Sequence, residues 1–175
     1  MRYMYDAVTP SNIPSGAAMV AGYADGYYAN MGEMAALFPH AIRVSIAVKW
    51  TTRAQVLDVE NGDATPAQAV QWCTQTMSDR SNSELTVYCN TSTWPEVRAA
   101  FQGAHVTEPN YWVAAYDGVA SIPAGAVAKQ YLGDYNGYDK SIVADYWPGV
   151  DQTPAPTPPP APKPFDRRKL DEEVR

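Results

Sequence analysis

Residues 55–66 read QVLDVENGDATP and hold the end of a strand, a turn and the start of a helix. The apolar residues of VLDV at 56–59 surround one acid, Asp58, and a second acid, Glu60, closes the run. The Asn-Gly pair that follows is a turn signal, and the Thr-Pro pair at 65–66 fits a helix cap and the first helical residue. A hydrophobic strand that ends in two acids therefore leads directly into a helix.

Eight strand-like runs recur along the chain at fairly even spacing. Several of them, such as IRVSIAV and YWVAAY, are apolar on both faces. Strands of that kind are usually covered on both sides, as in parallel sheets. We expect the strands at Tyr3–Val8, Met19–Tyr23, Ile42–Val48, Gln55–Glu60, Leu85–Asn90, Tyr111–Asp117, Ala126–Tyr131 and Ser141–Tyr146.

Helix signals lie only between the early strands. Asn30, Thr65 and Thr93 can each cap a helix, the last of them in a capping box with Glu96. After Asp117 the gaps between strands shrink to about ten residues, which is too short for a crossover helix and its turns. The sequence therefore predicts an α/β fold: a TIM-like barrel of eight mostly parallel strands with an incomplete ring of helices, of the (β/α)5(β)3 type.

Composition and charge exclude several classes of protein. Of the 175 residues, 46% are apolar and 18% are charged, which is typical of a globular domain with a core. The net charge of −6, without a basic patch, predicts no nucleic-acid partner. No apolar run is long enough to span a bilayer, and the N-terminus MRYMYDAVTP lacks a secretory signal. We therefore expect synthesis in the cytoplasm and no membrane partner.

The sequence divides into three parts. We expect a barrel domain at 1–147, a Pro-rich linker at 148–164 and a charged tail at 165–175. The tail is either a solvated end without fixed structure or a docking peptide. The two cysteines, Cys73 and Cys89, are too few for a disulfide scaffold. We expect free core thiols, with a single bridge as the alternative.

Acids fall near the ends of five of the expected strands, which is where barrels of this kind place their active sites. Residues two apart on a strand share a face, so Asp58 and Glu60 should both point into the barrel mouth while Val59 points outward. Two close carboxylates repel, so one of them should keep its proton to a higher pH. Cleavage of a glycosidic bond needs such a pair, although the acids could instead cap loops or bind a structural cation. The strand-end acids are Asp6, Asp25, Asp58, Glu60, Asp117 and Asp145.

Aromatic residues accompany these acids, and their rings suit the flat C–H faces of sugars. We expect Tyr116 and Tyr131 to be the strongest sugar contacts. No Cys or His cluster has the spacing of metal ligands, so we expect no metal and no cofactor. A Gly-x-Ser-x-Gly elbow and a phosphate-binding glycine loop are also absent from the sequence. The aromatic residues on or beside the strands are Tyr5, Tyr23, Tyr88, Trp112, Tyr116, Tyr131 and Tyr146.

Five segments resemble, in the same order, motifs of the glycoside hydrolase family 25 lysozymes, the N-acetylmuramidases of bacteria and phages. They are LDVE at 57–60, LTVYCNTSTW at 85–94, YWVAAYDG at 111–118, AKQY at 128–131 and GYDKSIVADYW at 137–147. The sequence looks similar to a divergent actinobacterial or actinophage branch. The resemblance implies a barrel of eight strands with five helices.

The resemblance also implies a role for each matching residue. Glu60 would be the proton donor, and Asp58 would assist it or stabilise the transition state. Asp6 and Asp145 would line the −1 sugar subsite. Further substrate contacts are expected from strand residues at the same rim, namely Asp25, Tyr88, Trp112, Tyr116, Asp117, Gln130 and Tyr131.

These features predict a peptidoglycan-cleaving glycosidase of a bacteriophage, either an endolysin or a lysin carried on the virion, that acts on bacterial cell-wall glycan. A second hypothesis is a non-catalytic module of the phage particle that binds glycan or has a structural role. It would dock to other virion proteins through residues 148–175. The segments MYDAVTP, VAGYADGYY and SIAVKW favour this second hypothesis, because they depart from the family's first three strands. A third is a glycosidase for another wall or surface polysaccharide.

Overall fold

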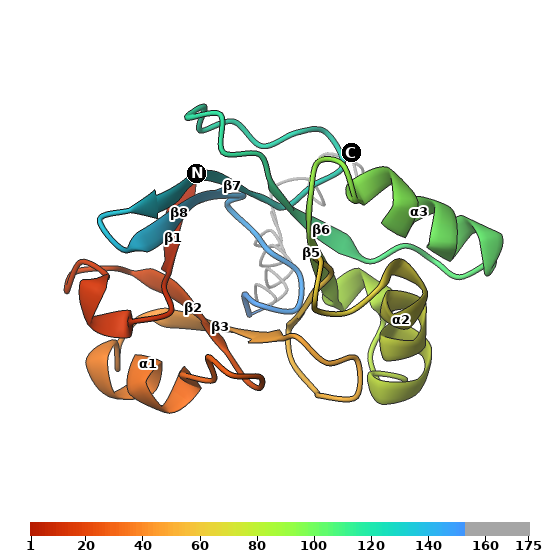
Figure 1. Cartoon of the computed structure of the whole chain (residues 1–175), viewed down its shortest axis with the longest axis horizontal. Helices are drawn as coiled ribbons and strands as arrows, with labels where there is room; N and C mark the ends of the chain where they lie inside the picture. The colour runs from red at the N-terminus through yellow and green to blue at the C-terminus, as the bar shows by residue number, and fades with distance from the viewer. Residues whose placement is uncertain (153–175) are drawn as a thin grey trace, which may run out of the picture.

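A computed structural model describes residues 1–152, and in it eight strands close into a barrel (Figure 1). Neighbouring strands follow the order of the sequence, and each pair from β1–β2 to β6–β7 is parallel. β8 runs antiparallel to both β7 and β1. The strands are β1 Arg2–Asp6, β2 Met19–Tyr23, β3 Ile42–Ala47, β4 Val56–Asp58, β5 Thr86–Asn90, β6 Asn110–Ala114, β7 Ala128–Tyr135 and β8 Tyr138–Val143. The predicted fold, an incomplete TIM-like α/β barrel, is confirmed.

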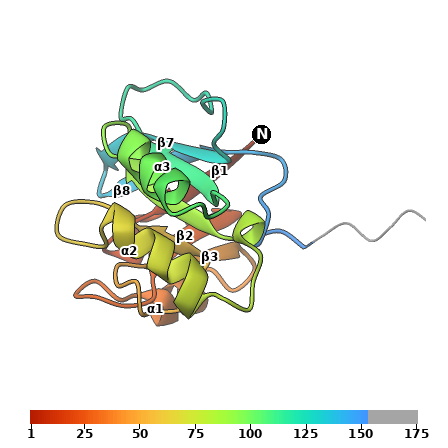
Figure 2. The same cartoon turned by 90° about the vertical axis from the view of Figure 1, so that its right-hand side faces the viewer.

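The ring of helices is sparser than the resemblance implied. The described residues contain three α-helices, α1 Met31–Leu37, α2 Pro66–Gln71 and α3 Trp94–Gly103, and a π-helical turn at Trp72–Thr76 extends α2. Short 3-10 turns lie at Pro10–Asn12 and Asn82–Glu84. α2 and α3 lie side by side over β4, β5 and β6, whereas none of the three described α-helices covers β7 and β8 (Figures 1 and 2). None of these helices is long and apolar enough to cross a bilayer.

The three predicted helix caps have different outcomes. Thr65 and Gln68 form the complete capping box of α2. Thr93 makes no side-chain cap, and its backbone amide instead donates to the Asn90 side chain. Asn30 also makes no cap. Its Oδ1 accepts from the amide of Tyr23 at 2.9 Å and its Nδ2 donates to the carbonyl of Ala7 at 2.9 Å, so Asn30 ties the ends of β1 and β2 together.

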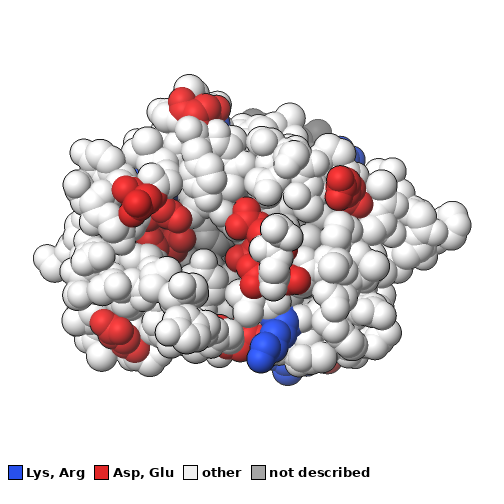
Figure 3. All heavy atoms as spheres, viewed as in Figure 1, with Lys and Arg blue, Asp and Glu red and all other residues white. Residues whose placement is uncertain are grey.

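The barrel interior is filled by alternate residues of the strands, and it opens as a hollow at the end seen in Figure 3. Trp147 closes the opposite end. Its Nε1–H donates to Thr86 Oγ1 at 2.8 Å, and its ring packs edge-on against Trp112, with 6.0 Å between ring centroids. Trp112 in turn donates to Ser141 Oγ at 3.0 Å. The apolar residues of the interior include Met4, Ala21, Val44, Val56, Ala128 and Val143.

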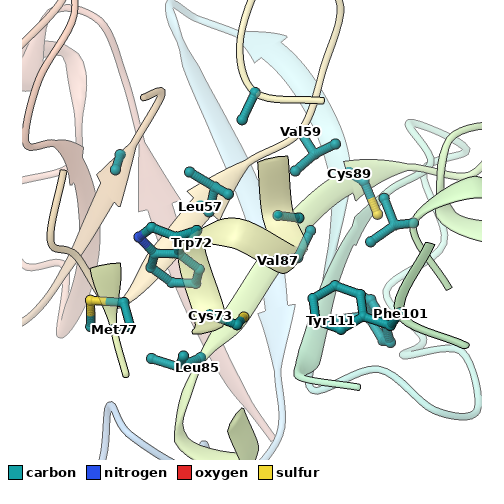
Figure 4. Close-up of a cluster of buried hydrophobic side chains, with 14 of the residues drawn as sticks. Leu57, Val59, Trp72, Cys73, Met77, Leu85, Val87, Cys89, Phe101 and Tyr111 are labelled. Atoms are coloured by element: carbon teal, nitrogen blue, oxygen red, sulfur yellow. The ribbon is translucent and has the colours of Figure 1, made fainter. Parts of the chain in front are cut away.

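A second cluster of buried side chains lies outside the barrel, between β4–β6 and the helices α2 and α3 (Figure 4). Val59 points into this cluster, as the alternation along the strand predicts. Cys73 and Cys89 are buried in it as free thiols, which confirms that interpretation of the cysteines. Phe101 of α3 and Trp72 after α2 supply the largest apolar surfaces from the helices.

The last described residues stay attached to the barrel. Val150 packs against the interior cluster beside Trp147. Both carboxylate oxygens of Asp151 accept from the guanidinium of Arg2 at 2.7 Å. The expected linker from residue 153 onward and the whole expected tail at 165–175 lie outside the described residues.

Candidate active site

The ends of β1–β7 converge at one end of the barrel, which we call the mouth. Figure 3 shows acidic side chains gathered on both sides of the hollow there. Asp6 and Asp58 face inward because Met4 and Val56, two residues earlier, are part of the interior cluster. Glu60 follows two positions after Asp58 and lies close enough to raise the pKa of that carboxyl. The structure therefore brings together three of the four acids that sequence analysis selected as catalytic.

One buried side chain, Gln130 of β7, organises the mouth. Its Nε2 donates to both carboxylate oxygens of Asp6 at 3.1 and 3.2 Å and to Asp139 Oδ2 at 3.0 Å. Its Oε1 accepts from the hydroxyls of Tyr88 at 2.5 Å and Tyr116 at 3.0 Å. Gln130 is only 1% exposed, so these protein side chains, and not water, supply the hydrogen-bond partners of both its amide nitrogen and its amide oxygen. The network fixes two acids and two tyrosines from separate elements against one another.

Burial and mutual repulsion change the ionisation of two carboxyls. Burial, and then the neighbouring Asp139, raise the pKa of Asp6 to about 8, against the hydrogen bond from Gln130, which lowers it. Burial, and then Glu60, raise the pKa of Asp58 to about 8. Asp58 is 4% exposed, and its Oδ1 has no hydrogen-bond partner within residues 1–152. Burial therefore favours the protonated form of both carboxyls.

Two further acids of the mouth, Glu60 and Asp139, are half-buried. Burial raises the pKa of Glu60, and a contact with the Asn90 side chain opposes this shift. Burial likewise raises the pKa of Asp139, although the backbone amide of Asp134 donates to its Oδ1 at 2.5 Å and lowers it. The mouth thus combines protonated carboxyls with acids that solvent can reach, which is the combination that acid–base chemistry requires.

The eighth strand contributes Asp139, which sequence analysis missed, and not Asp145. Asp139 pairs with Asp6 across the antiparallel β1–β8 ladder. Because β8 runs against its neighbours, its start lies at the mouth and its end lies at the opposite end of the barrel. Asp145, just beyond that end, has a side chain that is 81% exposed and contacts the amino group of Met1. The prediction that Asp145 lines the site is therefore wrong.

A sequence signal for this reversal exists. The stretch YNGY at 135–138 contains an Asn-Gly pair, the strongest short hairpin signal. In the structure Asn136 and Gly137 have φ values of 56° and 81°, and Tyr135 pairs with Tyr138 across the turn. Such a tight hairpin requires that β8 be antiparallel to β7.

The remaining predicted acids make local contacts. Asp25 lies at the mouth, but its Oδ1 accepts from the amide of Val48 at 2.7 Å and thus holds the loop after β3. Both oxygens of Asp117 accept from Lys129 Nζ at 2.8 Å, and this hydrogen bond lowers the pKa of Asp117. Lys129 alternates with the inward-facing Gln130, so this ion pair lies on the outer face of the barrel.

Some of the predicted aromatic residues lie at the mouth, and others are buried or point outward. Tyr88 and Tyr116 lie at the mouth, where Tyr116 adopts a φ of 24°, which is rare for a residue other than glycine. Trp112 is buried under Tyr88, with 4.8 Å between ring centroids, and has almost no exposed surface for a ligand. Tyr131 points outward against Tyr3, because it alternates with Gln130. The expectation that Trp112 and Tyr131 present their rings at the mouth is therefore wrong.

Of the other aromatic residues, Tyr23 lines the mouth cavity, whereas Tyr5 packs outside against Tyr138 and Tyr146 is exposed beyond the end of β8. The mouth cavity has a volume of about 260 Å³ and is also lined by Asp6, Asp134 and Asp139. Asp58 and Glu60 are not part of its lining. A larger cavity, of about 550 Å³, lies elsewhere, beside the starts of β1 and β2, and contains no acid.

Within residues 1–152, no three His, Cys, Asp or Glu side chains are arranged to hold a metal ion. The fold and this site together define an incomplete α/β barrel with an acid-lined mouth. Comparison with models of protein families, with curated proteins and with solved structures found no match. The chemistry of the mouth must therefore be argued from its own residues.

The raised pKa values predict that the protein loses stability between pH 5 and pH 8. An unfolded chain ionises Asp58 near its ordinary pKa of 3.8, whereas the folded protein keeps the proton up to about pH 8. In this window the folded state binds more protons, so the free energy of unfolding falls as the pH rises and levels off above about 8. Each such group contributes at most about 1.4 kcal/mol per pH unit. Urea unfolding at both pH values measures the loss.

The matched control for this prediction is Asp58→Asn, which keeps the shape of the side chain but cannot ionise. Its stability should fall less than that of the wild type between pH 5 and pH 8. Carboxyls with lowered pKa values, such as Asp151, lose their contribution only at more acidic pH and do not mask the effect. Equal pH slopes for wild type and variant would contradict a protonated Asp58.

Proposed function

We propose that the protein is a peptidoglycan-cleaving glycosidase of the muramidase type, similar to the glycoside hydrolase family 25 lysozymes. The observation that carries the proposal is the pair at the end of β4. A buried, protonated Asp58 lies two residues before a half-buried Glu60, and other acids face this pair across the mouth. The closed barrel of eight strands also supports the proposal, although it carries three α-helices where the resemblance implied five.

In the proposed reaction Glu60 donates its proton to the glycosidic oxygen as the bond to the anomeric carbon breaks. Its raised pKa favours the protonated form that a general acid needs. Positive charge develops at the anomeric carbon, and an ionised carboxylate on the facing wall stabilises it. We assign this place to Asp139, whereas the resemblance gave stabilisation of the transition state to Asp58 and a place in the −1 subsite to Asp145. Water then adds to the anomeric carbon and gives a proton to the Glu60 carboxylate, which restores the acid, and no step requires a cofactor.

Gln130 and the two tyrosines bonded to it position the sugar-facing groups in this mechanism. Because the Gln130 amide is bonded to Asp6 and Asp139 together, the two carboxyls cannot move independently. Tyr116 is half exposed at the mouth and offers a ring face and a hydroxyl to a sugar. The proposed natural substrate is bacterial cell-wall glycan, and the proposed setting is a phage endolysin or a virion-associated lysin.

Incubation of the full chain with insoluble peptidoglycan tests the proposal. We expect new reducing ends, with N-acetylmuramic acid at the reducing end of each product in mass spectrometry. Asp145→Asn, at the opposite end of the barrel, should release them at the wild-type rate. If no wall preparation yields reducing ends, the glycosidase proposal fails. Products from a different polysaccharide would support a glycosidase of another specificity.

A second candidate function is a non-catalytic glycan-binding or structural module of a phage particle. The saturated network around Gln130 favours it, since Asp6 is nearly sealed from solvent and Gln130 has no free donor for a sugar. Quantification of the protein in purified virions, next to the activity assay, distinguishes the two functions. A high copy number without wall hydrolysis would favour the module.

A further inference from the structure

An apolar groove runs along the outer face of the barrel beside the starts of β1 and β2, and we call it the β1–β2 groove. Its cavity has a volume of about 550 Å³, twice that of the mouth cavity. No helix within residues 1–152 covers it, because the connection from β1 to β2 forms only the 3-10 turn Pro10–Asn12. The lining residues include Arg2, Tyr3, Tyr5, Pro14, Met19 and Ile42.

The groove presents an ordered aromatic surface. Tyr3 is 47% exposed, yet its ring is held between Tyr131, at 6.4 Å between centroids, and the Lys140 ammonium, which lies 4.3 Å from the Tyr3 centroid. Small residues, Gly16 to Ala18, form another part of the lining. Shallow grooves lined by aromatic side chains are the surfaces that bind proline-rich segments in the extended polyproline II conformation.

The chain itself delivers such a segment to this place. Arg2, which lines the groove, holds Asp151 through two hydrogen bonds of 2.7 Å. Asp151 Oδ2 also accepts from the amide of Trp147 at 2.6 Å, so the chain is fixed at the groove just before the described residues end. Residues 153–164 then read TPAPTPPPAPKP, in which seven of twelve residues are proline.

We propose that residues 153–164 bind in the β1–β2 groove of their own chain as a polyproline II segment. At about 3.1 Å per residue, twelve residues extend to roughly 37 Å, which is ample to cross two neighbouring strands about 4.8 Å apart. Proline fixes φ in advance, so docking orders few additional torsions. The groove lies beside the starts of the strands and the mouth at their ends, so this docking is independent of the proposed glycosidase activity.

Paramagnetic relaxation in the full chain tests the docking. A nitroxide attached at Ala161→Cys is selective, because Cys73 and Cys89 are buried. We expect loss of amide signals from residues 2–5, 16–18 and 42, with the signals of α2 and α3 preserved. The loss of these amide signals should persist when the spin-labelled protein is diluted into protein without a spin label, because the contact is within one chain.

Two variants separate docking from chance proximity. Tyr3→Ser together with Ile42→Ser removes exposed apolar surface from the groove and should restore the lost signals. Tyr28→Ser, an equally exposed tyrosine outside the groove, should leave the loss unchanged. Absence of a localised loss, or a loss on another face, overturns the proposal. A loss seen only between molecules assigns the segment to a second copy and overturns it equally.

Discussion

Glu60→Gln should lower the rate of peptidoglycan hydrolysis by about 10²–10⁴-fold, the usual contribution of a general acid. Glutamine keeps the shape of the side chain and can still contact Asn90, but it has no proton to donate to a leaving oxygen. The fold should persist, because Glu60 is half-buried and makes no ion pair among the described residues. Release of reducing ends from purified cell wall measures the effect.

A second readout distinguishes an acid from a residue that only supports the mouth. Removal of the Glu60 charge takes away one of the causes that raise the pKa of Asp58, so Asp58 should titrate at lower pH in the variant. NMR titration of the Asp58 carboxyl follows this shift. An Asp58 shift with unchanged hydrolysis would place Glu60 at the mouth but exclude it as proton donor.

Trp147→Ala should lower the free energy of unfolding by about 3–5 kcal/mol, the usual cost of removing a large aromatic side chain from a core. Trp147 is fully buried and closes the end of the barrel opposite the mouth. Its loss opens a cavity beside Trp112 and leaves Thr86 Oγ1 without its donor. Urea unfolding followed by circular dichroism measures the loss, because tryptophan fluorescence changes with the substitution itself.

The matched control for the core substitution is Tyr27→Ala. Tyr27 is 94% exposed on the loop after β2, so its removal should change the free energy of unfolding by no more than about 0.5 kcal/mol. If Trp147→Ala lowers the free energy of unfolding no more than Tyr27→Ala does, the stability of the barrel interior does not depend on Trp147.

Most of the fold could be predicted because hydrophobic strands and short gaps are local properties of the sequence. All eight strands overlap their expected ranges, and Met19–Tyr23 agrees at both ends. The largest differences lie at the last two strands. β7 continues to Tyr135 and β8 begins at Tyr138, and the pairs between them, Leu132 with Lys140 and Tyr135 with Tyr138, show no apolar alternation along the strands. These two strands are longer than expected because their backbones pair with each other, which the pattern of side chains does not show.

The candidate site could be predicted only in part. Alternation along one strand predicts that Asp58 faces inward and Val59 outward, as observed, because it depends on nothing outside that strand; Glu60 lies beyond the end of β4. The predictions for Asp145 and Tyr131 differ from the structure for two reasons. The Asn-Gly signal at 136–137 that reverses β8 was not used. Gln130 and Tyr131 are adjacent on β7, so only one of them can face inward, and strand pairing decides which. Gln130 forms hydrogen bonds with two acids and two tyrosines that come from four other segments of the chain. No local sequence pattern predicts this network.

The antiparallel direction of β8 determines where the protein can be attached to a surface or to another domain without blocking the mouth. If all eight strands were parallel, the residues after β8 would lie next to the acids of the mouth. A domain fused there would then obstruct the mouth. With β8 turned around, Asp151 lies at the far pole, where the start of β1 also places Met1. Attachment at Met1, or directly after Asp151, to a particle, a bead or a partner domain therefore leaves the acid-lined mouth facing outward.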